Sequence, residues 1–370
     1  MHASPQRDQL SLLGQPARYA TGLEDLGGGL FAWLQPNGEL GESNAGLVVG
    51  AGESLLIDTL WDLRLTRRML DALAPHTAAA PITRLVNTHG DGDHCWGNQL
   101  LPGVEIIATR ACAEDMTRED PKRLRILSGA GTALSGLDGR RLRSQATRLG
   151  QLWSRAPLPG AGKLAGLSAF VRMLSAYDFE GVEITAPTLT FQRRHELDVG
   201  GRSVELIEVG PAHTPGDLIA HVPDERVVFA GDLVFVGVTP IMWVGPVENW
   251  TSGLDRITEI APRKVVPGHG PTTDLEGVRA MRAYWEFVAA AVRERLANGL
   301  DPYAAARDIV RSREFAEQPF SEWDARERIA INAAVLARSD SGGRGRVPEQ
   351  TRLRLLAQMG ELGAELRRAQ

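Results

Sequence analysis

Short apolar runs separated by turn signals dominate the first part of the chain. Residues 29–59 read GLFAWLQPNGELGESNAGLVVGAGESLLIDT, with Asn-Gly, Gly-Glu-Ser-Asn and Gly-Ala-Gly between the apolar runs. This alternation predicts an antiparallel meander. Apolar residues at helical spacing over Leu63–Leu73 predict a helix, and short apolar runs predict strands at Arg84–Thr88 and Val104–Ala108. The first part is therefore expected to alternate strand and helix.

A basic segment with a helical pattern follows. From Glu114 to about Ser175 strand patterns vanish, and leucines and alanines recur at roughly helical spacing. The stretch from Lys122 to Arg172 contains ten Lys and Arg residues and only one acidic residue, Asp138. We interpret residues 114–185 as a helical insert. Its arginines fit a solvated helix surface best, and the alternative is a lid that presents cations to an anionic substrate group.

Strand patterns resume at Thr188 and give way to helices toward the C-terminus. Two hairpins are predicted, turned at Gly200-Gly201 and at Pro223-Asp224. The pattern further predicts helices at 249–260, 275–296 and 348–368, a strand at 264–266 and helical structure after Pro302. Residues 339–346 have the composition of a flexible joint. The two β-rich halves predict a pair of facing sheets with helices outside.

Composition narrows the class of protein. The 370 residues are 43% hydrophobic and 24% charged, with a formal net charge of -5. This balance gives no reason to expect nucleic acid or a membrane as partner. Two cysteines are too few for a disulfide framework, and neither a signal peptide nor a membrane span is evident. We therefore expect a cytoplasmic enzyme with a small-molecule substrate; the C-terminal helices offer a surface for a homo-oligomer.

Histidines and aspartates recur where predicted strands end. NTHGDGDHCWGN crowds two histidines and two aspartates at the end of one strand, and PAHTPGDL, VVFAGDLVF and KVVPGHGP each add one such residue beside a glycine. Side chains that alternate at a strand end point the same way, and glycine lets the backbone bring a ligand close to an ion. An aspartate after an apolar strand is poorly solvated unless a positive group pairs with it. The candidate metal-binding residues are His89, Asp91, Asp93, His94, His213, Asp232 and His269.

This ordered set resembles the metallo-β-lactamase superfamily, whose pattern is His-x-His-x-Asp-His, then a single His, a bridging Asp and a last Gly-His. The resemblance covers roughly residues 28–112 and 186–274. It implies a mixed α/β (α+β) fold, the four-layer αββα sandwich, over residues 20–275, with the insert at 114–185. A helical C-terminal extension at 276–370 follows.

The resemblance also implies a ligand set and a chemistry. By analogy His89, Asp91 and His213 hold one metal ion, Asp93, His94 and His269 hold a second, and Asp232 bridges them. Two divalent metal ions are implied, with zinc as the first choice and iron or manganese as alternatives. A metal-bound hydroxide would attack an ester, thioester, lactone or amide bond, because metal binding lowers the pKa of water. Asp93 and Asp232 are the candidate catalytic residues, one of which would relay a proton to the leaving group.

Asp91 departs from the pattern, which has histidine there. A carboxylate ligand makes a site harder, and this favours iron or manganese relative to zinc. It also resembles the flavodiiron proteins, so a non-haem di-iron oxidoreductase is the rival enzyme class. A third reading gives Asp91 only an indirect contact with the metal. The non-enzymatic rival is a binding protein with a degenerate metal site.

The sequence also suggests roles for residues close to the candidate metal-binding positions. Cys95 follows His94 directly, and we expect it to pack and not to ligate. The family resemblance implies that Asp58 orients a ligand imidazole. Met242 and Trp243 lie on the loop that leaves Asp232, where substrate contact and ordinary packing are both compatible with the sequence.

Overall fold

Two β-sheets form the centre of the computed structural model, which describes residues 10–12, 14–38, 40–137 and 173–369. In spatial order, the seven-stranded sheet comprises β1 (Gly22–Gly27), β2 (Leu30–Leu34), β3 (Ala45–Val49), β4 (Ser54–Ile57), β5 (Ile82–Val86), β6 (Glu105–Thr109) and β7 (Leu189–Phe191). Strands β1 to β4 pair antiparallel, and β4 to β7 pair parallel. The predicted meander is confirmed.

The second sheet has five strands. Its members are β8 (Arg194–Val199), β9 (Arg202–Glu208), β10 (Leu218–Val222), β11 (Val227–Phe235) and β12 (Lys264–His269), with β11 and β12 parallel. Both predicted hairpin turns are confirmed, since Gly200-Gly201 joins β8 to β9 and Pro223-Asp224 lies between β10 and β11. Strand β12 runs three residues further than the strand predicted at 264–266.

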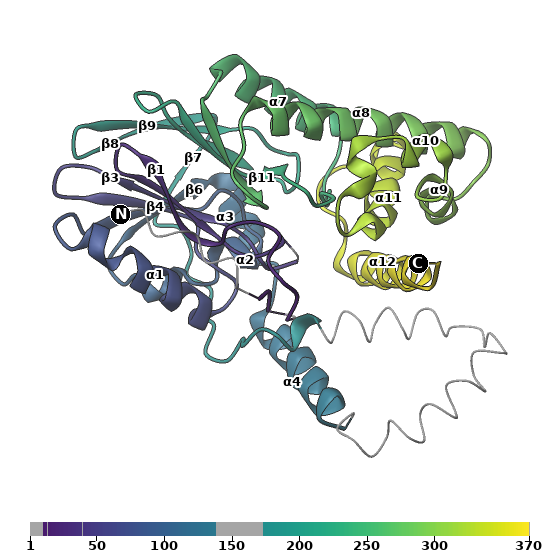
Figure 1. The fold of residues 1–370 in the computed structure, drawn as a ribbon, viewed down its shortest axis with the longest axis horizontal. Coiled ribbons are helices and arrows are strands. Elements are labelled where there is room, and N and C mark those ends of the chain that lie inside the picture. Colours follow the sequence, from purple (N-terminus) through teal and green to yellow (C-terminus); the bar gives the residue numbers. More distant parts are fainter. Residues whose placement is uncertain (1–9, 13, 39, 138–172, 370) are drawn as a thin grey trace.

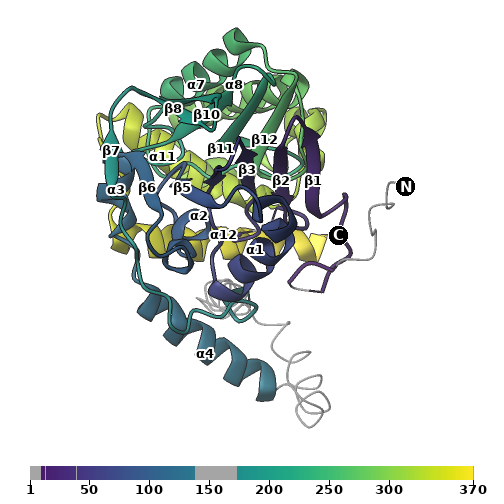
Figure 2. The same cartoon turned by 90° about the vertical axis from the view of Figure 1, so that its left-hand side faces the viewer.

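Helices cover the outer faces of both sheets. Helices α1 (Leu63–Thr77) and α3 (Arg110–Met116) contact the seven-stranded sheet, and α7 (Val247–Ile260) and α8 (Leu275–Ala297) contact β11. Figures 1 and 2 show the resulting order of helix, sheet, sheet and helix. The predicted four-layer αββα fold is therefore confirmed.

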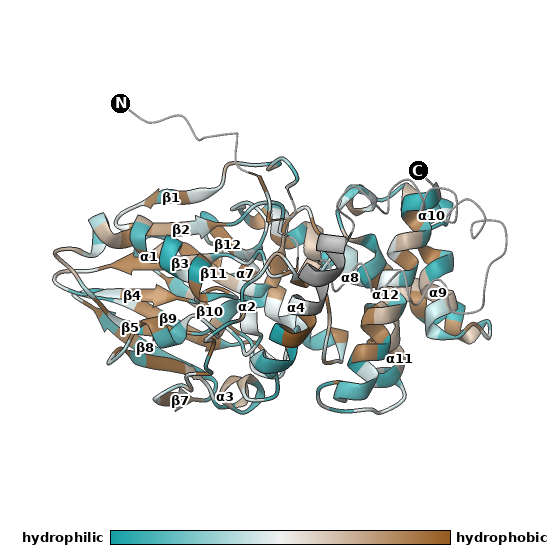
Figure 3. Ribbon diagram, turned by 90° about the horizontal axis from the view of Figure 1, so that it is seen from below, coloured by the Kyte–Doolittle hydropathy of each residue, from teal (hydrophilic) through white to brown (hydrophobic). Residues whose placement is uncertain are grey.

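Apolar side chains from both sheets fill the space between them. Leu55, Ile57 and Val86 from one sheet and Leu206 and Phe229 from the other belong to one buried cluster. In Figure 3 the central strands carry much of the brown, apolar colour. This packing fixes the strand ends, from which the candidate site residues project.

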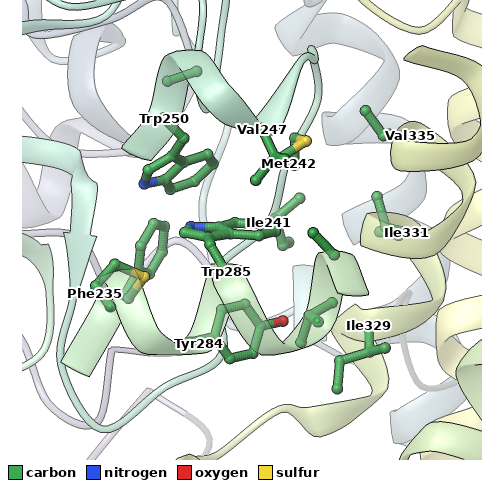
Figure 4. Close-up of a cluster of buried hydrophobic side chains, with 14 of the residues drawn as sticks. Phe235, Ile241, Met242, Val247, Trp250, Tyr284, Trp285, Ile329, Ile331 and Val335 are labelled. Carbon is green, nitrogen blue, oxygen red and sulfur yellow. The ribbon is translucent and has the colours of Figure 1, made fainter. Parts of the chain in front are cut away.

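The C-terminal part is helical, as predicted, and shares a core with the sandwich. Its elements are α9 (Pro302–Ile309), α10 (Arg313–Ala316), η2 (Pro319–Glu322), η3 (Arg326–Arg328), α11 (Ile329–Asp340) and α12 (Glu349–Ala369). Figure 4 shows Ile331 and Val335 of α11 in the same apolar cluster as Trp250 of α7 and Trp285 of α8. The extension is thus packed into the molecule and not attached as a tail.

The predicted insert and joint are described only in part. Helix α4 (Pro121–Leu137) projects from the body in Figure 1, and most basic residues of the insert fall in 138–172, outside the described residues. The flexible joint predicted at 339–346 does not stay exposed at its C-terminal end. Arg346 is only 9% exposed, and Val347, which follows it, is 5% exposed. Among the described residues, no helix is long and apolar enough to cross a membrane.

Candidate metal centre

The turn after β5 carries four of the candidate residues. Strand β5 ends at Val86, and the chain turns through His89 into a short helix, α2 (Gly92–Cys95). Asp91 is the N-cap of α2, with extended backbone and no capping hydrogen bond from its side chain. Its carboxylate is therefore free to turn away from the helix, while Asp93 and His94 project from the helix itself.

The structure brings six of the seven candidates into two compact groups. In each group, one possible ligand atom per residue lies within 4.8 Å of every other. The first group is His89, His213 and Asp232, and the second is Asp93, His94 and His269. Both could hold a metal ion. Segments separated by more than a hundred residues converge here, as the sequence pattern predicted.

Asp232 reaches both groups. Its Oδ2 lies 3.3 Å from Nε2 of His213 and 3.5 Å from Nε2 of His269, and its Oδ1 lies 3.1 Å from Nε2 of His94. Gly231, with φ +50, precedes it at an irregularity in the β11–β12 ladder. A positive φ is accessible to glycine without the strain that other residues would meet. The bulge therefore aims a carboxylate from inside a fully buried strand at both groups.

Three histidines are held from behind by hydrogen bonds. Nδ1 of His94 lies 2.9 Å from Oδ2 of Asp58, and Nδ1 of His213 lies 2.6 Å from the carbonyl oxygen of Ile241. Nδ1 of His89 lies 3.0 Å from Oγ1 of Thr88, whose hydroxyl also donates to Asp58. Such contacts fix the ring orientation and leave Nε2 for a ligand. The contact expected for Asp58 is confirmed.

Unsatisfied buried atoms mark the centre. Nε2 of His89, Nε2 of His94 and Oδ1 of Asp232 are buried and form no hydrogen bond, although the last two atoms lie 3.1 Å apart. Buried polar atoms are nearly always satisfied, so a missing partner needs an explanation. Imidazole nitrogen and carboxylate oxygen are common ligands of divalent metals. The residues present therefore fit the metal ions that the sequence pattern implied.

Electrostatics within the centre lower the pKa of Asp232. Burial would raise the pKa of the Asp232 carboxyl, but the surrounding imidazoles outweigh burial and hold this pKa well below its usual range. Burial and the neighbouring His94 lower the pKa of His89, which favours the neutral, ligating form of its ring. Burial also raises the pKa of the Cys95 thiol, and its Sγ lies 3.3 Å from the backbone oxygen of Asp91. This contact agrees with a packing role for Cys95.

Asp91 is paired with an arginine that the sequence analysis did not single out. Nη2 of Arg346 donates to Oδ1 of Asp91 at 2.5 Å, and Nε2 of His213 lies 3.2 Å from Oδ2. Asp91 belongs to neither compact group of ligand atoms. Arg346 lies in the SDSGGRGR stretch, which has the composition of a joint. The only local signal was the unpaired carboxylate at position 91, and nothing in the sequence chose Arg346 among the arginines.

An apolar cavity of about 200 Å³ opens onto the two groups. Asp93, Asp232 and His269 contribute to its polar end. Most of the lining surface is apolar and comes from several elements: Leu40, Trp61, Leu124, Leu127, Phe235, Ile241, Trp243, Leu353 and Leu356. Charged and polar side chains complete the lining: Asp91, Arg118, Glu119, Asp120, Arg123, His213, Arg328, Glu349 and Arg352. Trp243 lines this cavity, whereas Met242 is fully buried in the apolar core. The loop after Asp232 thus packs into the core through Met242 and lines the cavity through Trp243, and contact of Trp243 with a substrate stays a prediction.

Comparison with known proteins identifies the family. The profile described as "Metallo-beta-lactamase superfamily" matches residues 38–269, well over half of the chain. The chain belongs to the metallo-beta-lactamase superfamily. The family match and the similar proteins together identify the chain as an enzyme, a metallo-hydrolase of this superfamily.

Two similar proteins carry different names. The acyl-coenzyme A thioesterase MBLAC2 of Bos taurus is 27% identical over 269 residues, which cover 68% of this chain and 82% of that protein. The 2,4-dinitroanisole O-demethylase subunit alpha of Nocardioides sp. is 29% identical over 252 residues, covering 67% of this chain and 58% of that protein.

Solved structures share the fold at low identity. A metallo-beta-lactamase family protein from Thermus thermophilus has a TM-score of 0.54 at 16% identity, with 88% of this chain and 97% of that chain covered. The sec-alkylsulfatase Pisa1 from Pseudomonas sp. has a TM-score of 0.58 at 17% identity, covering 86% of this chain and 50% of its own. Both likenesses extend beyond residues 38–269, so the shared fold is larger than the family match.

Proposed function

We propose that the chain hydrolyses an ester or thioester with an apolar acyl group, using two divalent metal ions. The observation that carries this proposal is the position of Asp232 between two His/Asp groups at the polar end of an apolar cavity. The direct ligands would be His89 and His213 for one ion, Asp93, His94 and His269 for the other, and Asp232 for both. Zinc is the metal we expect first, because the donors are mostly imidazole.

The bound ions would supply a nucleophile at neutral pH and polarise the scissile carbonyl group. The protein's own residues then have distinct tasks. Asp93 faces the cavity, and we propose that the oxygen of its carboxylate that does not hold the ion passes a proton to the leaving group. Asp232 is held ionised and would keep both ions in place. The apolar walls would hold the acyl group and exclude water.

The substrate class rests on the cavity and on the relatives. Ligand sites are typically apolar with a few convergent polar groups, and this cavity has that form. A name given to similar proteins, acyl-coenzyme A thioesterase, fits an acyl group in such a cavity. Lactone and amide bonds remain alternatives within the same chemistry. The di-iron alternative loses its main support, because the charge of Asp91 is balanced by Arg346.

Metal removal and reloading test the proposal. Chelator-treated protein should lose hydrolysis of p-nitrophenyl esters and acyl-coenzyme A thioesters, and Zn²⁺ should restore it. His94→Ala and Asp232→Ala should each lower zinc content and reduce kcat/KM by roughly a hundredfold or more, because losing even an outer contact of a ligand costs about 10–100-fold. His195→Gln is the matched control, because His195 stacks on Phe191 away from the centre. Full zinc content in both alanine variants would refute the ligand assignment.

A further inference from the structure

The C-terminal extension reaches the metal-binding turn through a buried charge network. Arg346 contacts Asp91 through Nη2 and Asp115 of α3 through Nη1. Arg352 of α12 pairs with Glu119, whose Oε2 accepts a hydrogen bond from the backbone N–H of Gly92 at 3.3 Å. Two arginines from the extension therefore hold the turn that carries His89, Asp93 and His94.

The members of this network are withdrawn from water. Arg346 is 9% exposed, Asp91 7% and Asp115 1%. A buried ion pair that loses one partner leaves an uncompensated charge in a medium that solvates it poorly. Asp115 has a second cation, since Nε of Arg118 lies 3.4 Å from its Oδ1. Arg346 is the guanidinium in direct contact with Asp91, for which burial alone would favour the protonated form.

The pair has the net charge of a neutral imidazole. Asp91 contributes one negative charge and Arg346 one positive charge, beside the group of His89, His213 and Asp232. Asp91 touches that group through His213. Histidine at position 91 would bring no charge in its ligating form. A carboxylate alone at this position would make the first site more anionic, and the arginine cancels this change.

We propose that Asp91 and Arg346 act as one unit whose net charge sets the metal affinity of the first site, with Arg346 as a positioning residue supplied by the C-terminal extension. The inference rests on the proposed two-metal centre. It assigns the extension a part in metal binding, whereas the resemblance placed every metal ligand in the sandwich. The expected ligand role of Asp91 stays a prediction, and the variants below distinguish it from a role through charge.

Three variants separate the effects of charge and of coordination; Asp91→Asn keeps the side-chain shape, and Arg346→Gln shortens the side chain and removes its charge. Arg346→Gln gives the pair a net charge of minus one, Asp91→Asn gives plus one, and the double variant restores zero. Metal-free full-length protein is titrated with Zn²⁺ against a competing chelator, and zinc-edge anomalous diffraction assigns each site. First-site affinity should rise roughly tenfold in Arg346→Gln and fall roughly tenfold in Asp91→Asn, because a unit charge near an ion acts through a partly screened medium. The double variant should return to the wild-type value.

Each outcome decides between readings. A double variant as weak as Asp91→Asn would show that Asp91 is a direct ligand and would overturn the proposal. Unchanged or weaker zinc binding in Arg346→Gln would also overturn it. Arg346→Lys keeps the charge and should behave as wild type; it tests the proposal if the glutamine variant does not fold. Arg307→Gln is the control, since it breaks an ion pair with Glu365 on the extension's surface. Wild-type protein that binds no zinc would refute the proposed function itself.

Discussion

Individual residues behind the ligands determine how well the centre is organised. Asp58 accepts hydrogen bonds from the backbone N–H and the hydroxyl of Thr88 and contacts Nδ1 of His94. Its backbone has a φ of +62, which a non-glycine residue adopts only at some cost. The surrounding structure holds this conformation, and the carboxylate orients two adjacent parts of the site.

Asp58→Asn should weaken zinc binding without removing a ligand. The amide has one acceptor oxygen instead of two, so His94 or Thr88 loses its partner. Loss of such an outer contact costs about 10–100-fold in metal affinity, and we expect that range for the second site. Competition titration with Zn²⁺ measures it. Asp62→Asn is the control, because Asp62 is an equally buried aspartate that caps α1; equal losses in both variants would mean that general destabilisation explains the effect.

Among the elements, those with local signals were predictable from the sequence. The Gly200-Gly201 and Pro223-Asp224 turns and the ends of α8 follow from turn chemistry and helical spacing. The convergence of the candidate metal-binding residues followed from histidines and aspartates at strand ends. Asp232 was expected after a strand and lies inside one, because the Gly231 bulge lets the strand continue. Arg346 was not predictable, since its partner Asp91 is 255 positions away and its own segment has the composition of a joint.

Helix α12 contributes an apolar wall to the cavity, and this part can be tested without touching the core. Leu353 lines the cavity and is 54% exposed, so a polar substitution there costs little stability. Leu353→Glu should raise KM for long acyl substrates about three- to tenfold and leave short ones nearly unchanged, because apolar contact area is lost only with long chains. Steady-state kinetics across acyl lengths measures this. Ile126→Glu on α4 is the matched control, an exposed apolar residue outside the cavity lining. Parallel changes in both variants would contradict the assignment.

At the scale of the whole molecule, the extension and the sandwich share one interior. Trp250 of α7, Trp285 of α8 and Ile331 of α11 are fully buried in the same cluster. Leu355 and Leu362 of α12 are buried in the same cluster. Self-association through the C-terminal helices stays a prediction, and it would have to use their remaining faces. The boundary expected at residue 275 marks a change in the sequence pattern, but residues on both sides of it share one hydrophobic core.

Truncation after residue 274 should therefore produce a chain that does not fold on its own. Removing α8 to α12 would uncover Trp250 and the outer face of β11, which α7 and α8 cover together. Each large apolar side chain returned to water costs about 1.5–3 kcal/mol, and several such losses exceed the net stability of about 5–15 kcal/mol of a typical domain. The truncation would also remove Arg346 from Asp91. We expect insoluble or molten protein, judged by near-ultraviolet circular dichroism and thermal melting in the presence of Zn²⁺.

A chain shortened only after residue 366, which retains Arg346 and most of α12, should melt cooperatively. If the 274-residue chain melted cooperatively and bound zinc at wild-type affinity, the sandwich would be an independent domain, and the extension would have no part in the metal centre.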